Sequence, residues 1–407
     1  MDLPRGIIGP LACIVAALLC CCGGYSVGRR AYADRLARSS EMADLDRAIR
    51  LVPGNAAYWL RRADLLERDM TSPVESLERA AALNPFDSDT WIRLGLDAEN
   101  RRDYARAESR LLQAARVSRR YQPRWTLANY YFRRGSVDQF RSWARQALEL
   151  EPEYPDAIFQ LCWKMPLPAN EIFENYIPPN RGAWRSYLRF LFSENHVDAA
   201  GYVVTRLIPD AQSADRDMLL EASDRFLASK AIGLASAAWN ALCDRGLMTC
   251  RSIPASGDIS LDDTTDTRAL GHGFAWHIGQ IHGVTTASRA GMMSVDFSGS
   301  QPENAEIAWR WIPVKSRQRL RLRFGYQTSG IVPGSGLTWQ ILGVENSNLL
   351  AASASLSNSV WSEQQLRFDV PSGLELVRVT LRYSRPPGQV RIDGSLSTRS
   401  MRIEMAP

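Results

Sequence analysis

The chain has 407 residues, of which 45% are hydrophobic and 23% are charged. This composition is ordinary for a globular protein of two or three domains and excludes disorder over the whole chain. The net charge of +5 comes almost entirely from arginine, since lysine occurs only at Lys164, Lys230 and Lys315. The arginines are spread along helical stretches among acidic residues, which favours solvated helix faces over a nucleic-acid-binding surface.

An apolar segment without charge covers residues 7–22, and with its glycine and tyrosine flanks it reaches the length of a bilayer-spanning helix. We expect a signal-anchor helix and an N-terminal membrane anchor over residues 1–34. A cleaved signal peptide ending near residues 31–33 and a lipoprotein signal are the alternatives. The signal peptide is disfavoured because Arg29 and Arg30 lie directly before its cleavage site. The lipoprotein signal is disfavoured because Leu19, before Cys20, is larger than the small residue that such a site requires.

The charges around this segment give conflicting signals for topology. Arg5 precedes it, whereas Arg29, Arg30, Arg35 and Arg38 follow it, so the positive-inside rule places the body of the chain in the cytoplasm. The C-terminal domain described below favours the exterior. We expect a single-pass protein of a bacterial cell membrane whose main body is periplasmic or extracytoplasmic.

Small and large apolar residues recur with a period of about 34 residues from about 40 to 154. The units cover about 54–87, 88–120 and 121–154, and a half unit precedes them. Each has small residues where two helices cross, and the units that end near 87 and 154 have a proline near the end, which stops the second helix. The positions that recur include Ala63, Leu94-Gly95, Leu127-Ala128, Ala80, Ala114, Ala147, Pro85 and Pro152.

These stretches resemble the tetratricopeptide repeat family, whose units are pairs of antiparallel helices stacked into a solenoid. The resemblance implies an extended groove that binds a protein partner. Arg93, Asn129 and Arg133 fall on the groove face of the first helices, so they are the candidate partner contacts. From 155 to 250 the helical period continues while the repeat pattern fades, and we interpret this part as degenerate helix pairs that complete a helical domain over 35–250.

Near residue 251 the helical period gives way to alternation of apolar and polar residues. About eight one-sided strands separated by glycine, proline and serine predict an antiparallel β-sandwich over 251–407. In the run Ile307, Trp309 and Trp311, the two tryptophans share one strand face, and we expect that face to lie in the core.

The sandwich is similar in layout to jelly-roll carbohydrate-binding modules of the galactose-binding-like kind, which implies a ligand site where sugar rings stack on exposed aromatic residues. Candidate ligand contacts are Trp276, Tyr326, Trp361 and Arg385. The overall expectation is an α + β multidomain chain with a transmembrane helix, an all-α tetratricopeptide-type solenoid and a C-terminal jelly-roll sandwich.

Motifs that would carry catalysis or bind a metal are weak in this sequence. His272, His277 and His282 do not align on one face of a strand or helix, and Asp262, Asp263 and Asp266 suit a solvated loop better than a calcium site. We therefore expect no metal and no cofactor.

The pair Cys243 and Cys250 allows either a small disulfide, if this part is outside the cytoplasm, or two buried thiols.

The leading hypothesis is a non-enzymatic, membrane-anchored scaffold. Its repeats bind a protein partner and its sandwich a polysaccharide, in exopolysaccharide or envelope assembly, without nucleic acid. The alternative is a hydrolase or lyase that acts on polysaccharide, which needs two carboxylates in one cleft.

Overall fold

The computed structural model describes residues 5–150, 153–253, 259–260, 270–289, 291–344 and 348–406; the side chains of 5–15, 259–260 and 289 are not described. The chain divides into two compact units, residues 1–187 and 188–407. The first unit contains helices, and the second contains further helices followed by the sandwich.

The first unit begins with α1 (Arg5–Ala37), a helix of 33 residues. The predicted apolar segment 7–22 lies mostly among residues whose side chains are outside the described set. Over the part of the chain that is described, none of the helices combines the length and apolar character needed to cross a bilayer. At its C-terminal end α1 packs on the solenoid, because Ala33 and Ala37 are buried with Leu45 and Tyr58.

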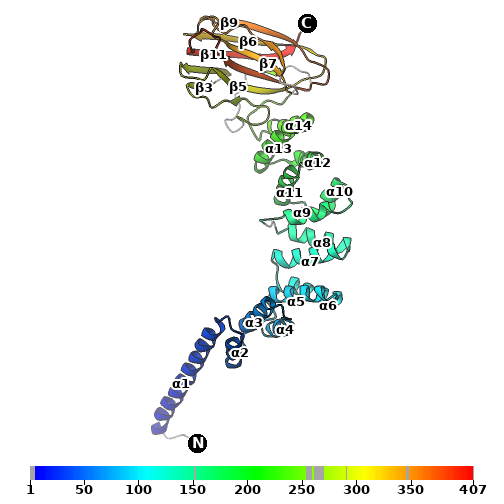
Figure 1. Cartoon of the computed structure of the whole chain (residues 1–407), viewed down its shortest axis with the longest axis vertical. Coiled ribbons are helices and arrows are strands. Elements are labelled where there is room, and N and C mark those ends of the chain that lie inside the picture. Colours follow the sequence, from blue (N-terminus) through cyan, green and yellow to red (C-terminus); the bar gives the residue numbers. More distant parts are fainter. Residues whose placement is uncertain are drawn as a thin grey trace. The chain divides into compact units, whose positions relative to one another are not determined.

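Helix pairs with the predicted boundaries follow α1, which confirms the repeat prediction. The half unit contributes α2 (Met42–Leu51). The first helices of the three units are α3 (Ala56–Arg68), α5 (Ser88–Asn100) and α7 (Tyr121–Arg133). The second helices are α4 (Val74–Leu83), α6 (Tyr104–Val117) and α8 (Val137–Leu148). In Figure 1 the first helix of each of these pairs lies on one side of the solenoid and the second on the other.

The small residues occupy the helix crossings, as the repeat pattern predicts. Ala63 and Ala128 are fully buried. At the equivalent position of the middle unit, a Cβ atom on Gly95 would lie 2.6 Å from Cδ2 of Leu111, which belongs to the paired helix. The close approach of α5 and α6 therefore depends on glycine.

The helix pairs share one turn geometry. The residue two positions after the end of the first helix has a left-handed backbone. The next amide donates a hydrogen bond to a carbonyl five residues earlier, which closes a Schellman motif. The left-handed residues are Met70, Arg102, Gly135, Asn195 and Lys230. The matching bonds are Thr71 to Leu66, Asp103 to Ala98, Ser136 to Tyr131, His196 to Leu191 and Ala231 to Phe226, at 2.7–3.0 Å.

This turn identifies the degenerate helices as continued helix pairs. It joins α11 (Arg181–Ser193) to α12 (Val197–Leu207), and α13 (Arg216–Ala228) to α14 (Ile232–Asp244). Between the regular and the degenerate pairs lie α9 (Asp156–Trp163) and α10 (Ala169–Tyr176), each of eight residues and separated by the proline-containing segment 164–168. The predicted degenerate helix pairs are thus confirmed.

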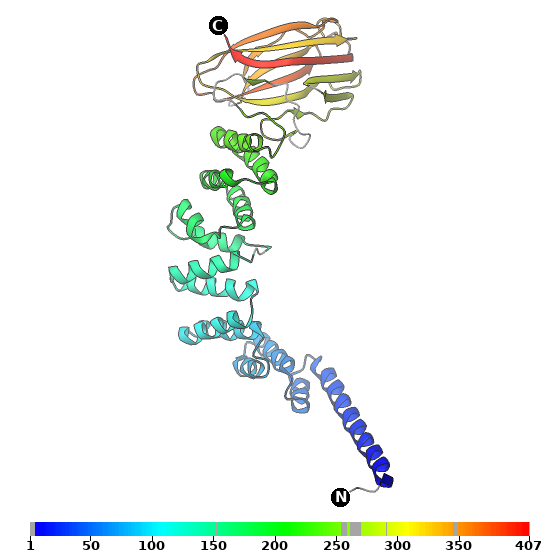
Figure 2. The same ribbon diagram turned by 180° about the vertical axis from the view of Figure 1, so that it is seen from behind.

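The C-terminal part is an antiparallel sandwich of two sheets. Sheet A has the strand order β3-β4-β11-β6-β9, with β1 also paired to β11, and sheet B has the order β2-β5-β10-β7-β8. The two layers are visible from both sides in Figures 1 and 2. The strands are β1 (Ile259–Ser260), β2 (His277–Ile278), β3 (Val284–Arg289), β4 (Met292–Ser298), β5 (Asn304–Pro313), β6 (Arg319–Ser329), β7 (Leu337–Gly343), β8 (Leu349–Ala352), β9 (Ser362–Asp369), β10 (Leu376–Ser384) and β11 (Asp393–Met405).

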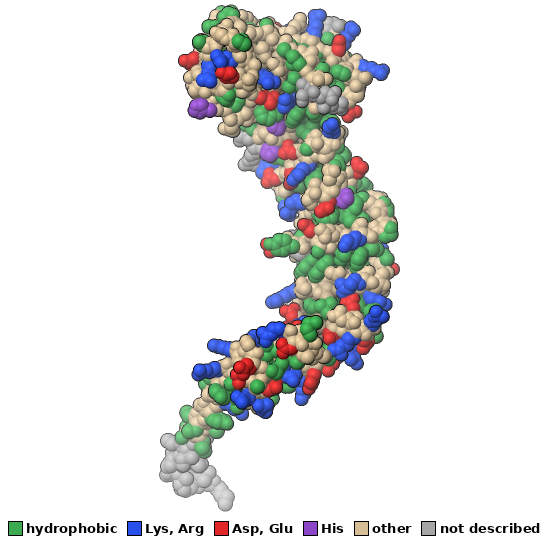
Figure 3. All heavy atoms as spheres, in the orientation of Figure 1, with side chains coloured by type: hydrophobic (Ala, Val, Ile, Leu, Met, Phe, Trp, Pro, Cys, Tyr) green, Lys and Arg blue, Asp and Glu red, His purple; other side chains and the backbone are tan. Residues whose placement is uncertain are grey.

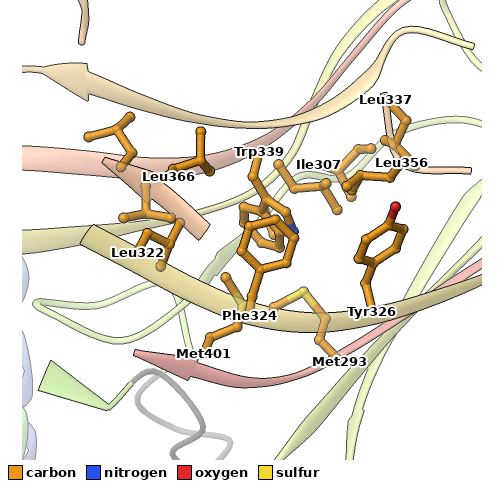
Figure 4. Packing of buried hydrophobic residues seen from close by; sticks show 14 of the residues in the cluster. Met293, Ile307, Leu322, Phe324, Tyr326, Leu337, Trp339, Leu356, Leu366 and Met401 are labelled. Atoms are coloured by element: carbon orange, nitrogen blue, oxygen red, sulfur yellow. The ribbon is translucent and has the colours of Figure 1, made fainter. Parts of the chain in front are cut away.

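Inward-facing residues of the two sheets interlock to form the sandwich core. Phe324 of sheet A and Trp339 of sheet B meet near its centre, with ring centroids 6.2 Å apart (Figure 4). Trp339 is fully buried, and truncation of such a side chain typically costs about 3–5 kcal/mol of stability. Strands β2, β3 and β8 were not expected from the sequence, and all three lie at sheet edges.

The two cysteines that the sequence left undecided form a disulfide, Cys243–Cys250, which joins the last turn of α14 to the segment after it. The residues that follow Cys250 are also held to α14 by side chains. The indole of Trp239 donates to the carbonyl of Arg251 (3.1 Å), and the Asn240 side chain accepts from the amide of Ile253 (2.7 Å). The chain therefore leaves the last helix pair along a fixed path.

Candidate functional site: the tryptophan face of sheet B

A β-bulge in β5 turns two tryptophans out of the core. Against β10, Leu381 lies opposite Ala308 while Arg382 lies opposite Glu306, so Ile307 is an extra residue. Ile307 and Ala308 are both fully buried, and beyond them the alternation is inverted. Trp309 and Trp311 consequently lie half-buried on the outer surface of sheet B. The expectation that this pair belongs to the core is wrong, because a single inserted residue shifts the phase of the strand.

The outward tryptophans form a cluster that we call the tryptophan face, made up of His277, Glu306, Trp309, Trp311, Arg378 and Thr380. The imidazole of His277 stacks on Trp309, with centroids 5.3 Å apart and planes 15° apart. It meets Trp311 edge-on at 6.4 Å. Burial lowers the pKa of His277 below its usual value, so the ring is neutral at neutral pH.

Polar groups are fixed beside these rings. The guanidinium of Arg378 lies 5.6 Å from the centre of the Trp311 ring and contacts the Glu306 carboxylate at 3.1 Å. The hydroxyl of Thr380 donates to the same carboxylate at 2.8 Å. Flat aromatic rings with oriented donors and acceptors beside them are the arrangement that binds sugar rings, because the apolar face of a pyranose stacks while its hydroxyls form hydrogen bonds.

A cavity of about 410 Å³ adjoins this face within the second unit. Sheet B contributes His277, Trp311 and Leu376, and the end of α13 contributes Leu227 and Ala228, with Asp224, Lys230, Gly271 and Val344 completing the wall. This volume lies in the range of small-molecule sites and suits a short piece of a sugar chain better than a long one.

The wall of the cavity is held in place by the segment 270–276. The carboxylate of Asp224 in α13 accepts a hydrogen bond from the amide of Gly273 (2.6 Å) and contacts Nδ1 of His272 (2.7 Å). Gly273 has a φ of +52°, and a Cβ there would lie 2.6 Å from the Trp239 ring. The segment therefore docks closely on the last helix pair.

The aromatic residues of this segment anchor it on both sides. Phe274 is buried against Trp239, with centroids 6.1 Å apart. Trp276 is buried against Trp339 in the sandwich core, with centroids 5.8 Å apart. The segment 270–276 therefore joins the last helix pair to the sandwich within one compact unit.

The four ligand contacts predicted from the sequence are not brought together. Trp276 and Tyr326 are 5% and 1% exposed and belong to the core, so they are corrected to structural residues. Trp361 is 38% exposed but lies by sheet A, where the Arg399 guanidinium covers its ring at 4.0 Å. Arg385 follows β10, where it pairs with Glu303 and donates to the carbonyl of Gln389.

The predicted groove residues of the solenoid connect neighbouring first helices. Arg93 of α5 contacts Asp64 and Glu67 of α3 at 2.9 and 3.0 Å. Arg133 of α7 binds Glu99 of α5 through two bonds of 2.8 and 2.7 Å and also donates to Asn129 at 3.1 Å. Figure 3 shows basic and acidic side chains intermingled over the visible surface of the helix pairs. These three residues therefore belong to a row of ion pairs and hydrogen bonds that links α3, α5 and α7. We call this row the charge ladder.

The clustered histidines have separate roles. His272 pairs with Asp224, His277 belongs to the tryptophan face, and His282 is exposed. In the described ranges no group of three or more potential ligands is placed to hold a metal ion. Asp262, Asp263 and Asp266 lie outside the described residues.

No family model and no curated protein matches the sequence. Solved structures of two kinds match parts of the fold. Tetratricopeptide proteins resemble the helical part. They include the type IV pilus biogenesis factor PilW (16% identity, 54% of this chain and 91% of that chain, TM-score 0.27) and PilF of Pseudomonas aeruginosa (16%, 46% and 89%, TM-score 0.30).

Carbohydrate-binding modules resemble the sandwich. One is a family 4 module (10% identity, 33% of this chain and 86% of that chain, TM-score 0.27). Another is a module of a Cellvibrio mixtus lichenase in complex with cellotriose (10%, 32% and 92%, TM-score 0.21). At these levels of similarity the matches describe folds and assign no ligand or partner to this chain.

Proposed function

We propose that the protein is a membrane-anchored, non-enzymatic scaffold that holds a glycan on the tryptophan face and a protein partner on the solenoid. The observation that carries the glycan half is the bulge in β5, which brings Trp309 and Trp311 to the surface beside fixed polar groups. Strand alternation without the bulge would bury both rings. Exposure of two large apolar rings to water is unfavourable, and a ligand that covers them would regain that free energy.

The carboxylate on this face supports binding in preference to hydrolysis. Glu306 accepts from Thr380 and pairs with Arg378, so it orients the arginine beside Trp311. A glycosidase of the usual kind needs two carboxylic groups on opposite sides of one bond, with one of them able to hold a proton. Glu306 is already engaged by the Thr380 hydroxyl and the Arg378 guanidinium, an arrangement that suits a hydrogen-bond acceptor beside a bound sugar.

The test of the glycan half is binding of the full-length chain, in detergent, to a printed array of bacterial and plant polysaccharide fragments. We expect retention of glycans with exposed apolar pyranose faces. A wild-type chain that retains none of them would refute glycan binding.

The solenoid half is supported by the charge ladder on the first helices, where Arg93, Asn129 and Arg133 are oriented by their neighbours. Preorganised charged side chains on an extended surface favour recognition of a peptide or helix with complementary charges. Asn129→p-benzoylphenylalanine should cross-link the partner in cells. The matched control is Arg116→p-benzoylphenylalanine, on the second helix α6, where the side chain is exposed but lies away from the ladder. Equal capture at both positions would contradict a groove-side partner.

The anchor and the location outside the cytoplasm are part of the same proposal. The apolar segment 7–22 supports the anchor, and the Cys243–Cys250 disulfide supports an oxidising compartment such as the periplasm. The arginines after the segment favour the opposite topology. A C-terminal alkaline phosphatase fusion, compared with a C-terminal fluorescent-protein fusion that folds only in the cytoplasm, decides between them. Phosphatase activity is expected, and cytoplasmic fluorescence alone would reverse the topology. Glycan binding by the tryptophan face and partner binding by the solenoid would together support a role in exopolysaccharide or envelope assembly.

A further inference from the structure

The outer surface of sheet A carries a cluster of arginines on three neighbouring strands. Leu320, Leu322 and Phe324 of β6 point into the core, so the alternate residues of the strand point outward. We call this surface the arginine face; it consists of Arg319, Arg321, Arg323, Arg367, Arg399 and Arg402. It belongs to the other sheet from the tryptophan face and does not depend on the function proposed for that face.

The strand register places these arginines next to one another. Arg321 of β6 lies opposite Arg367 of β9, and Arg323 of β6 lies opposite Arg402 of β11. A bulge in β11, where Ser400 has a φ of 54°, brings Arg399 and Arg402 to the same outer surface although they are three residues apart. Without the inserted residue, positions 399 and 402 would point to opposite sides.

Carboxylates neutralise only part of this face. Arg319 pairs with Asp369, and Arg321 pairs with Glu404 at 2.7 Å. Glu404 also lies 3.6 Å from Arg323, and although burial acts in the opposite sense, these two arginines hold the pKa of Glu404 below its usual value.

The cations at the centre of the face are available. Arg367 and Arg402 are exposed, and among the described residues neither forms an ion pair. Arg399 is also exposed, and it lies over the Trp361 ring at 4.0 Å, a contact that holds its guanidinium in place on this face.

We propose that the arginine face binds an acidic polysaccharide through the carboxylates of its sugar units. Neighbouring strands are about 4.8 Å apart, which is close to the length of one pyranose unit in an extended chain. A flat array of guanidinium groups at that spacing matches successive carboxylates, and each arginine can bind a carboxylate through two parallel hydrogen bonds. Arg367, Arg402 and Arg399 are the groups that would make these contacts.

The test measures binding of the full-length chain, held in amphipol, to polygalacturonate and to the same polymer after methyl esterification. The variant is Arg367→Gln/Arg402→Gln. The matched control is Arg61→Gln/Arg68→Gln, which removes two exposed arginines of α3 in the first unit. Far-ultraviolet circular dichroism verifies that both variants are folded.

Wild type and the Arg61/Arg68 control should bind polygalacturonate and ignore its esterified form. The Arg367/Arg402 variant should bind it about tenfold more weakly or worse, since it loses charge-assisted hydrogen bonds. Equal weakening in both variants would mean that net charge alone attracts the polymer and would overturn the proposal. So would Arg367/Arg402-dependent binding to phosphatidylglycerol vesicles without binding to polygalacturonate, because the face would then recognise a lipid surface.

Discussion

His277 lies flat against Trp309, with ring centroids 5.3 Å apart and planes 15° apart. The two residues come from paired strands, since His277 is the register partner of Trp309. This stack fixes one tryptophan ring at the edge of sheet B and leaves its neighbour Trp311 beside the cavity. Both the stability of the fold and ligand binding are therefore linked to the protonation state of the His277 imidazole.

The stack should make stability depend on pH. Burial lowers the pKa of His277 in the folded chain, so below the usual histidine pKa of about 6.5 the unfolded chain binds the proton more readily. Stability contributed by the neutral ring is complete above that value and is lost as pH falls toward the folded-state pKa. The loss is at most about 1.4 kcal/mol per pH unit. Denaturant titrations at pH 7.5 and 5.0 measure it.

His277→Phe is the control for this titration, since it retains an aromatic ring that cannot be protonated. It should lose less stability than the wild type between the two pH values. An identical loss in both chains would show that the pH dependence does not come from His277.

The shared turn of the helix pairs predicts a stabilising substitution. Arg102 is exposed and has a φ of 63°, a conformation that glycine adopts without steric cost. Arg102→Gly should stabilise the chain by about 0.5–1 kcal/mol, the reverse of glycine's usual effect in a helix. Chemical denaturation followed by circular dichroism measures this change.

Gly135 occupies the same turn position in the next unit, with a φ of 66°, and provides the opposite substitution. Gly135→Ala should destabilise the chain by about 1 kcal/mol. Destabilisation by Arg102→Gly would show that this side chain has a role that its exposure does not indicate.

The disulfide predicts a count of reactive thiols. The sequence has seven cysteines, and two of them form the disulfide, so reduction of the denatured chain should make two further thiols reactive toward a thiol reagent. Loss of such a short cross-link costs about 2–3 kcal/mol, so Cys243→Ser/Cys250→Ser should unfold at lower denaturant concentration. Reductant should shift wild type by a similar amount and leave the double variant unchanged. An unchanged count after reduction would contradict the bond.

The sequence predicts the helix pairs well because their packing is local and periodic. Glu99 and Arg133, joined by two hydrogen bonds, are 34 residues apart, which is the length of one repeat. The degenerate pairs share the same turns although they lack the repeat pattern, since the turn depends on backbone geometry and is formed by Asn195 and Lys230 as well as by glycine. Edge strands such as β3 and β8 escape prediction because few of their residues face the core.

The candidate site could not be predicted because it depends on one inserted residue. Alternation along β5 places Ile307, Trp309 and Trp311 on a single face, and nothing in the sequence marks Ile307 as the residue without a partner. The bulge reverses the orientation of everything after it. Sequence reasoning also wrongly assigned Trp276 and Tyr326 as exposed ligand contacts. Whether an aromatic residue of a strand is exposed depends on whether the opposite sheet covers it, and the sequence does not give that arrangement.

The most direct test of the central claim is calorimetric titration of the full-length chain with the best neutral glycan from the array, which the arginine face cannot bind through carboxylates, using Trp309→Ala, Trp311→Ala and Trp361→Ala. Removal of a stacking ring on the tryptophan face should weaken binding by about five- to thirtyfold, since such stacking contributes about 1–2 kcal/mol. Trp361→Ala, on the other sheet, should bind like wild type. If Trp309→Ala and Trp311→Ala fold and bind as wild type does, the outward tryptophans are not the glycan site.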